Sequence, residues 1–350
     1  MACRSIKDRL KPWLLNSEGY VFSDVDADVR LHLNESPYPP PKHVVRYVVD
    51  ILEYGNLYMN SKLFSRFREL LAGYAGVDVE NILPTLGGDG ALRTIFYELT
   101  YPNDVVVILN PTYSMVNVFT SLRGLKKVTV ELHECGDWWC VDFNELLNNA
   151  KNSYLVVIDD PNNPTGSPIL KGGIKLVSEL AEVVEGFLVI DETYYEFSGY
   201  TVVQLVRDYP NIIVVRSLSK AFSLAGFRLG YIVSSPEVIE VLSKGYTPFD
   251  IPLPSLAVGI AALEDSSYVK VFVDSIKRNK ELLINGLRKL GFKVYNSLTN
   301  FVLVRSDVNI RELLLRYSIA IKSLGNNLYR ISVGSEEQCV KLLEVLGGVL

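Results

Sequence analysis

The chain has 350 residues, a length that suggests two domains or one large domain with a satellite. Its 35 Lys and Arg residues and 40 Asp and Glu residues give a formal net charge of −5, so electrostatics offer no reason to expect nucleic acid or an anionic membrane as a partner. The composition, 48% hydrophobic and 21% charged, excludes wholesale disorder. No apolar run reaches the ~18–20 residues of a membrane helix.

The first 40 residues are irregular and end in a proline cluster at Pro41. Residues 1–13 carry charges but no apolar core, so no secretory signal is expected. Proline lacks the N–H that helices and sheets require, so the cluster predicts an extended arm. Apolar residues at helical spacing then predict a helix from about Lys42 and a second over 63–74, ended by Gly76.

Short apolar runs and helical patterns alternate through the middle of the chain. The runs are 105–109, 155–158, 187–190, 212–215 and 229–233, and helical patterns cover 91–99 and 174–184. Continuous apolar runs are typical of strands buried on both faces. The sequence therefore predicts an α/β fold, a mainly parallel sheet sandwiched by helices.

The pattern changes after about residue 245. A long amphipathic helix is predicted over 268–290, then short strands at 301–304 and 330–333, and a closing helix over 336–346. We therefore expect a large domain over 42–245, and a small α+β domain formed by 246–350 together with the arm, 1–41.

Cysteine and histidine are scarce. Cys3, Cys135, Cys140 and Cys339 form no Cys-x-x-Cys pair, and the chain has only three histidines. We therefore expect no zinc site or other metal, reduced thiols, and a cytoplasmic location. Catalysis is expected to depend on Lys, Asp, Tyr and Arg.

Polar residues gather in four loops at the strand ends. Gly87–Gly90 before a helix would suit an anion, or form a plain loop. The segment 159–166, DDPNNPTG, is a rigid turn or part of a ligand site. Asp191 ends an apolar run, where it would cap a helix or face a cationic ligand group. Lys220 has apolar neighbours, and partial burial would lower its pKa and make the amine nucleophilic.

These loops belong to eight strings that occur in order from Leu33 to Gln338. They are LNESPYPP, LGGDGAL, NPTYSM, DDPNNPTG, VIDETYYEF, SLSKAFSLAGFRLGY, TNFVLV and YRISVGSEEQ. Together they resemble the class I/II aminotransferases of fold type I, which use pyridoxal 5′-phosphate (PLP). Within that class the chain is most similar to the histidinol-phosphate aminotransferase group.

The resemblance implies a role for each matching residue. Lys220 matches the Schiff-base lysine, and Asp191 the carboxylate that pairs with the pyridine nitrogen. Asn163 and Tyr194 match the groups that bind the phenolic oxygen, and Tyr113 the aromatic that stacks on the ring. The predicted phosphate ligands are the N–H groups of Gly88 and Asp89 and the side chains of Ser217, Ser219 and Arg228.

The resemblance also implies a homodimer with shared active sites, because Tyr58 matches a tyrosine that reaches the neighbouring subunit's phosphate. Arg330 matches the arginine that binds the substrate carboxylate, and Asn34 the segment that lines the substrate site. Two positions depart from the group. Trp13 replaces a tyrosine whose hydroxyl helps to hold the substrate phosphate, and Lys322 replaces an arginine aimed at the same phosphate. A serine near the cofactor phosphate is also replaced, by Gly88.

The implied reaction is transfer of an amino group between histidinol phosphate, or a related amino acid, and 2-oxoglutarate. Two alternatives on the same scaffold stay open: a threonine-phosphate decarboxylase, and a broad-range aromatic or aliphatic aminotransferase. A transcriptional regulator is disfavoured because no DNA-binding segment precedes the arm. A nicotinamide-dependent dehydrogenase is disfavoured because Gly87–Gly90 lacks the G-x-G-x-x-G pattern.

Overall fold

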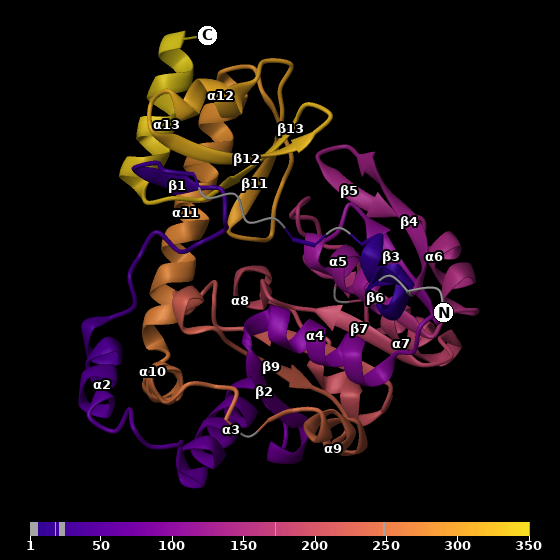
Figure 1. Cartoon of the computed structure of the whole chain (residues 1–350). Coiled ribbons are helices and arrows are strands. Elements are labelled where there is room, and N and C mark those ends of the chain that lie inside the picture. Colours follow the sequence, from indigo (N-terminus) through magenta and orange to yellow (C-terminus); the bar gives the residue numbers. More distant parts are fainter. Residues whose placement is uncertain (1–5, 18, 21–24, 172, 248, 350) are drawn as a thin grey trace.

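A computed structural model describes residues 6–17, 19–20, 25–171, 173–247 and 249–349, and its strands form two sheets (Figure 1). The larger sheet has eight strands in the order β2 (Ile82–Leu86), β9 (Leu229–Val233), β8 (Ile212–Ser217), β7 (Phe187–Asp191), β6 (Leu155–Asp159), β3 (Val105–Asn110), β4 (Lys126–Cys135) and β5 (Trp138–Val141). The smaller sheet has five strands in the order β1 (Val29–Leu31), β12 (Ile319–Gly325), β13 (Leu328–Ser332), β11 (Phe301–Arg305) and β10 (Lys293–Val294). The predicted α/β class is confirmed.

The centre of the larger sheet is parallel. β3, β6, β7 and β8 run side by side in one direction, and their Val, Ile and Leu side chains are buried because helices cover both faces. β9 was expected in a parallel setting, but it runs antiparallel to both β8 and β2. The loop 218–228 leads straight from β8 to β9, a direct connection that antiparallel neighbours allow and parallel ones do not.

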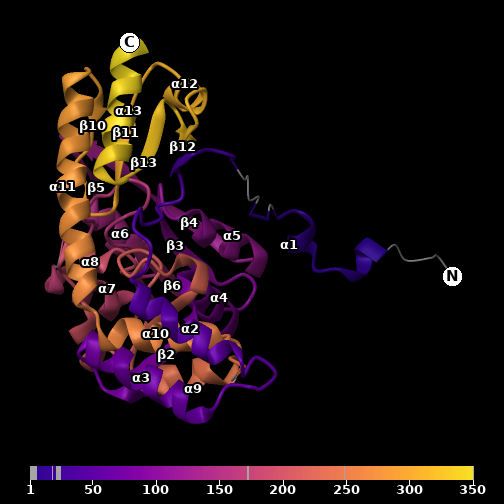
Figure 2. The same ribbon diagram turned by 90° about the vertical axis from the view of Figure 1, so that its left-hand side faces the viewer.

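Helices surround the larger sheet (Figures 1 and 2). They are α2 (Lys42–Leu52), α3 (Ser61–Ala75), η2 (Val79–Asn81), α4 (Gly87–Leu99), α5 (Ser114–Arg123), α6 (Phe143–Ala150), α7 (Ile174–Val183), α8 (Tyr195–Ser198), η3 (Val203–Arg207), η4 (Ala225–Phe227), α9 (Pro236–Lys244) and α10 (Leu253–Glu264). The Asn60 side chain caps α3, and Gly76 ends it in the left-handed region at φ 74°. α10 was not predicted from the sequence. It is apolar on all sides and packs against α2 and α3, so its sequence lacks the alternation of apolar and polar faces that indicates a surface helix.

The smaller sheet combines the two ends of the chain. Its helices are α11 (Ser267–Lys289), α12 (Ile310–Leu315) and α13 (Glu336–Val349). The arm was expected to be irregular, but its β1 strand adds a parallel edge strand beside β12. The arm also holds two short helices, η1 (Ile6–Arg9) and α1 (Pro12–Leu15), and α1 lies against α5. The domain boundary near residue 245 stays a prediction.

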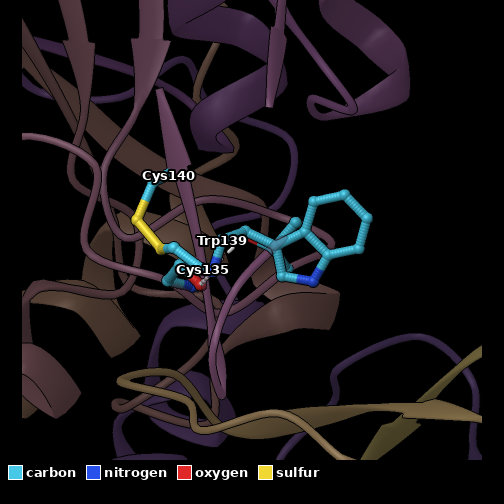
Figure 3. The surroundings of a disulfide bond; sticks show 5 residues. Cys135, Trp139 and Cys140 are labelled. Carbon is cyan, nitrogen blue, oxygen red and sulfur yellow. Dashed lines mark hydrogen bonds between the residues drawn. A yellow bond between two sulfur atoms is a disulfide. The ribbon is translucent and has the colours of Figure 1, made fainter. Parts of the chain in front are cut away.

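A disulfide joins Cys135 and Cys140 across the β4–β5 hairpin (Figure 3). The prediction of reduced thiols is wrong for this pair, because the antiparallel hairpin brings their Cα atoms within 6.0 Å, which spacing in the sequence does not reveal. Cys339 is a buried free thiol, and Cys3 lies outside the described residues.

The same hairpin connects the two sheets. Figure 3 shows the Trp139 ring turned away from the disulfide, and this ring lies 5.6 Å from that of Tyr295, next to β10. Glu134 of β4 forms ion pairs with Lys293 and Arg305 of the smaller sheet. These contacts hold the smaller sheet over one end of the larger one.

Within the described ranges, the helices and the metal-ligating side chains indicate neither a membrane span nor a metal site. None of the helices there combines the length and apolar character needed to cross a membrane. No group of three or more His, Cys, Asp or Glu side chains in those ranges is arranged to hold a metal ion.

Candidate active site

A cavity of about 720 Å³ lies between the two sheets, at the carboxyl ends of β6, β7 and β8. Asp159, Asp191 and Ser217 end these strands and line one side of the cavity. The smaller sheet lines the other side with Lys322 of β12 and Arg330 of β13. Open α/β sheets bind ligands at this edge, since the loops that follow the strands leave a crevice there.

All but one of the residues predicted for cofactor and substrate binding line this cavity. They are Asn34, Gly88, Asp89, Tyr113, Asn163, Asp191, Tyr194, Ser217, Ser219, Lys220, Arg228, Lys322 and Arg330. Tyr58 lies elsewhere: it is 80% exposed, and its ring packs 4.5 Å from that of Phe249. Its contact with a neighbouring subunit stays a prediction.

Lys220 lies on the loop between β8 and β9, with its amine at the cavity. Among the described residues, the Nζ atom makes only a long hydrogen bond, 3.4 Å, to the backbone oxygen of Leu33. Burial, and next the positive charge of Arg330, lowers the pKa of Lys220 to about 8. A sizeable fraction of the amine is therefore neutral near physiological pH, which is the nucleophilic and basic form.

Asp191 presents a buried carboxylate to the same cavity. One oxygen accepts a 2.9 Å hydrogen bond from the Thr193 N–H, and no Lys, Arg or His of the described residues forms an ion pair with it. Burial raises the pKa of Asp191 to about 6, and the negative charges of Asp89 and Glu192 add to this effect. A cationic group of a ligand would relieve this cost, so the carboxylate fits a protonated heterocycle better than it fits a helix cap.

Asp159 organises two loops of the site, a role the sequence reasoning missed. It accepts hydrogen bonds from Thr112 Oγ1 at 2.9 Å and from the Tyr113 N–H at 3.2 Å, both on the loop after β3. It also accepts from the Asn163 N–H at 2.7 Å and from Asn162 Nδ2 at 2.9 Å. These four bonds fix Tyr113 and Asn163 at the cavity. An acid followed by Asn-Asn between prolines was the available signal.

The amino end of α4 forms an anion cradle with the loop after β8. The helix begins at Gly87, not near Ala91 as predicted, so the free N–H groups of its first turn include those of Gly88 and Asp89. Ser217, Ser219 and Arg228 line the cavity beside them, and Arg228 pairs with Asp89 at 3.3 Å.

Glycine is required at the start of this cradle. At Gly87, where φ is +71°, an added Cβ would lie 2.9 Å from Arg228 Nη2. At Gly88 an added Cβ would lie 3.4 Å from Thr193 Oγ1, an ordinary contact. The structure therefore has room for the serine that the resemblance expects at position 88, and its absence removes a hydroxyl without closing the cradle.

Arg330 lines the cavity and has an N–H group without a hydrogen-bond acceptor among the described residues. Nη1 donates to Asn163 Oδ1 at 2.6 Å, and Nη2 to the His32 backbone oxygen at 2.8 Å. Its Nε is buried and lacks a hydrogen-bond partner among the described residues. The guanidinium also lies 5.4 Å from the Phe301 ring. A planar group held in this way suits the carboxylate of a substrate.

Asn34 and Tyr194 are held by one hydrogen-bond network. Asn34 Nδ2 donates to the Tyr194 hydroxyl at 2.9 Å, and Asn34, at φ 55°, is fixed by Ser332 and Asn300. Burial raises the pKa of Tyr194 to about 12, so its hydroxyl keeps its proton and can donate.

Tyr113 makes a contact, and Tyr20 has a position, that the sequence did not predict. The Tyr113 hydroxyl donates to Asp89 at 2.8 Å, and its pKa is raised by burial and then by the charge of Asp89. Tyr20 also lines the cavity, whereas Trp13 packs over Gly124 and donates to the Leu122 backbone oxygen at 3.1 Å. A tyrosine therefore lines the cavity at position 20, whereas Trp13 does not line it.

The chain matches the family described as "Aminotransferase class I and II" over residues 27–346. It is 53% identical to the histidinol-phosphate aminotransferase of Sulfurisphaera tokodaii over 99% of this chain and 97% of that one. It is 34% identical to histidinol-phosphate aminotransferase 2 of Archaeoglobus fulgidus, which covers 93% and 94% of the two chains.

Solved structures share the fold. The histidinol-phosphate aminotransferase of Sinorhizobium meliloti in complex with pyridoxal-5′-phosphate superposes with a TM-score of 0.87 at 24% identity, covering 100% of both chains. The aspartate aminotransferase of Thermus thermophilus with maleate has a TM-score of 0.81 at 25% identity, covering 93% of this chain and 92% of that one. With its arrangement of strand-end residues and these matches, the chain belongs to the class I and II aminotransferase family.

Proposed function

We propose that the chain is a PLP-dependent aminotransferase that transfers the amino group of histidinol phosphate to 2-oxoglutarate, with the cofactor attached at Lys220. The observation that carries this proposal is one cavity that holds a buried amine of lowered pKa, an anion cradle, and a buried carboxylate without a basic partner among the described residues. The two relatives named histidinol-phosphate aminotransferase, which match nearly the full chain, support the choice of donor.

The residues fit the groups of PLP one by one. Lys220 would meet the aldehyde, Asp191 the ring nitrogen, and Asn163 with Tyr194 the phenolic oxygen, while Tyr113 would lie against the ring. The phosphate would be held by Gly88, Asp89, Ser217, Ser219 and Arg228. When bound, PLP supplies an electron-accepting ring that stabilises negative charge on the carbon next to the substrate nitrogen.

The protein then has two tasks, to orient the substrate and to move a proton. The Lys220 amine would act as general base, removing the substrate α-proton and returning it to the cofactor carbon that carries the transferred nitrogen. Its lowered pKa suits it to both steps near neutral pH. The negative charge of Asp191 would favour the protonated form of the ring nitrogen.

Both substrates carry an anion that Arg330 can bind. Histidinol phosphate has no carboxylate, so Arg330 with Lys322 would bind its phosphate in one half-reaction. In the other half-reaction Arg330 would bind the carboxylate of glutamate. The Nε of Arg330, which lacks a partner among the described residues, and the nearby Lys322 give this one site the donors to bind either anion.

A panel of amino donors tests the choice of substrate. Holoenzyme is mixed with histidinol phosphate, threonine phosphate, an aromatic amino acid or aspartate, and conversion of the cofactor to its amine form is followed by absorbance. The fastest conversion is expected with histidinol phosphate. Carbon dioxide release from threonine phosphate would instead favour the decarboxylase, and equal rates with all donors the broad-range enzyme.

The pH dependence of cofactor uptake tests the Lys220 amine by itself. Below its pKa of about 8 the amine is protonated and unreactive, and above that pH it is neutral. Cofactor-free protein is therefore expected to bind added PLP covalently about tenfold faster at pH 9 than at pH 7. The rate is measured from the absorbance change, and a flat profile would contradict the assignment.

A homodimer with shared active sites and a cytoplasmic location belong to this proposal. The high exposure of Tyr58 and Phe249 on one surface supports a subunit contact there. Sedimentation at micromolar concentration is expected to give twice the mass of the chain.

A further inference from the structure

His32 is a buried side chain of the cavity that the proposed reaction does not use. It follows β1, is 4% exposed and lines the cavity. Neither ring nitrogen has a hydrogen-bond partner among the described residues. Buried polar atoms nearly always have a partner, so two unpartnered nitrogens at a cavity point to a ligand as the missing one.

The sheet places His32 at one end of a row of basic residues. β1 and β12 pair in parallel up to Leu31 and Ile321, so the next residues, His32 and Lys322, continue the row. Lys322 in turn pairs with Arg330 on β13. Paired residues of neighbouring strands project from the same face, and all three of these side chains line the cavity.

The surroundings disfavour the protonated form of His32 while the cavity holds no anion. Burial lowers the pKa of His32, and so do the positive charges of Arg30, Lys322 and Arg330. Glu35 acts in the opposite direction, but it is paired with Arg30 at 3.1 Å. A doubly negative ligand beside Lys322 and Arg330 would reverse this balance, because it would attract a third positive charge.

We propose that His32 takes up a proton from solvent when a phosphate dianion binds beside Lys322 and Arg330, and that it thereby favours phosphorylated substrates over those with only a carboxylate there. The proton forms an N–H on the imidazole that donates to a phosphate oxygen, and it returns to solvent when the phosphate leaves. This inference rests on the proposed function for the identity of the substrate, whereas phosphate binding is measurable without turnover.

Nuclear magnetic resonance on holoenzyme with labelled histidine tests the proton uptake. The chain has three histidines, His32, His43 and His133, so a His32→Gln variant identifies the His32 signal by its absence. With inorganic phosphate, His32 is expected to gain its proton at a pH about one unit higher, a tenfold rise in proton affinity. With acetate the change should be much smaller. An unchanged His32 titration in phosphate would overturn the proposal.

Inhibition and kinetics test the selectivity. In His32→Gln, which cannot take up a proton, inorganic phosphate is expected to inhibit about tenfold more weakly, as for loss of a hydrogen bond to a charged group. The KM for histidinol phosphate should rise by a similar factor, while that for glutamate changes less than about threefold. His43→Gln is the matched control, because His43 is exposed and pairs with Asp265 at 3.0 Å. Equal losses for phosphate and for glutamate would contradict a selective role.

A second variant and an independent readout separate the possible failures. His32→Asn places a shorter amide at the same position as His32→Gln, so a folding defect in one variant does not decide the result. Circular dichroism checks that both variants fold. If phosphate shifts the His32 titration but histidinol phosphate is no donor, the proposed function fails and this inference stands. If histidinol phosphate reacts but His32 does not respond, only this inference fails.

Discussion

Replacing Lys220 with Ala is expected to lower transamination at least about a thousandfold while the fold stays intact. The variant loses both the nucleophile and the proton carrier, and general acid–base catalysis alone contributes about 10²–10⁴-fold. Removing this buried amine, whose charged form is disfavoured, breaks among the described residues only the long hydrogen bond to the Leu33 backbone oxygen, so little stability is lost. Initial rates with histidinol phosphate and circular dichroism are the measurements.

Lys280 is the matched control for this variant. It is also a buried lysine whose pKa is lowered by burial to about 8, but its Nζ donates to the Ser297 and Thr299 backbone oxygens at 2.7 Å each, away from the cavity. Lys280→Met should therefore lower thermal stability and keep covalent cofactor binding. Similar activities of the Lys220→Ala and wild-type proteins would contradict the assigned role.

Asp191→Asn is expected to lower kcat/KM about a hundredfold or more and to weaken PLP binding. Asn keeps the shape and can still accept the Thr193 N–H, so the loss isolates the negative charge. Breaking a buried ion pair by removing one charge costs about 3–5 kcal/mol, and the cofactor nitrogen would be the partner left without its counter-ion. Steady-state rates and cofactor titration measure the two effects.

The same substitution should stabilise the cofactor-free protein. The pKa of Asp191 is raised to about 6 in the fold, so the folded state holds more protons than the unfolded state between that pH and the ordinary Asp value. Stability therefore falls as pH rises through this window, and at neutral pH the buried charge is unfavourable. A neutral Asn avoids that cost. A lower melting temperature of the cofactor-free variant would contradict this account, and Asp191→Glu, which keeps the charge, is the control.

The parallel centre of the larger sheet could be predicted because burial on both faces leaves continuous apolar runs, as in β6 and β7. α10 could not, since a helix buried on all sides has no polar face. β12 was also missed, because its half-exposed sequence, IAIKSLG, carries no continuous run. The Cys135–Cys140 disulfide depends on the pairing of β4 with β5, which local spacing does not show.

The residues of the candidate site likewise divide into those that the local sequence indicates and those that it does not. Gly88, Asp191 and Lys220 lie at or just after the ends of strands, and glycine or polar residues in such positions can be recognised in the sequence. Arg330 and Asn34 were found only by resemblance, because the topology brings them to the cavity from opposite ends of the chain. Tyr20, Asp159 and His32 were missed as site residues. Their roles depend on contacts between segments far apart in the sequence, which no local pattern encodes.

Borohydride reduction of the holoenzyme, followed by proteolysis and mass spectrometry, tests the central claim most directly. Reduction makes the covalent link between PLP and the protein permanent, so the modified lysine can be identified. One modified peptide is expected, and it should contain Lys220. A cofactor adduct on any other lysine, or protein that retains PLP without any adduct, would contradict the account.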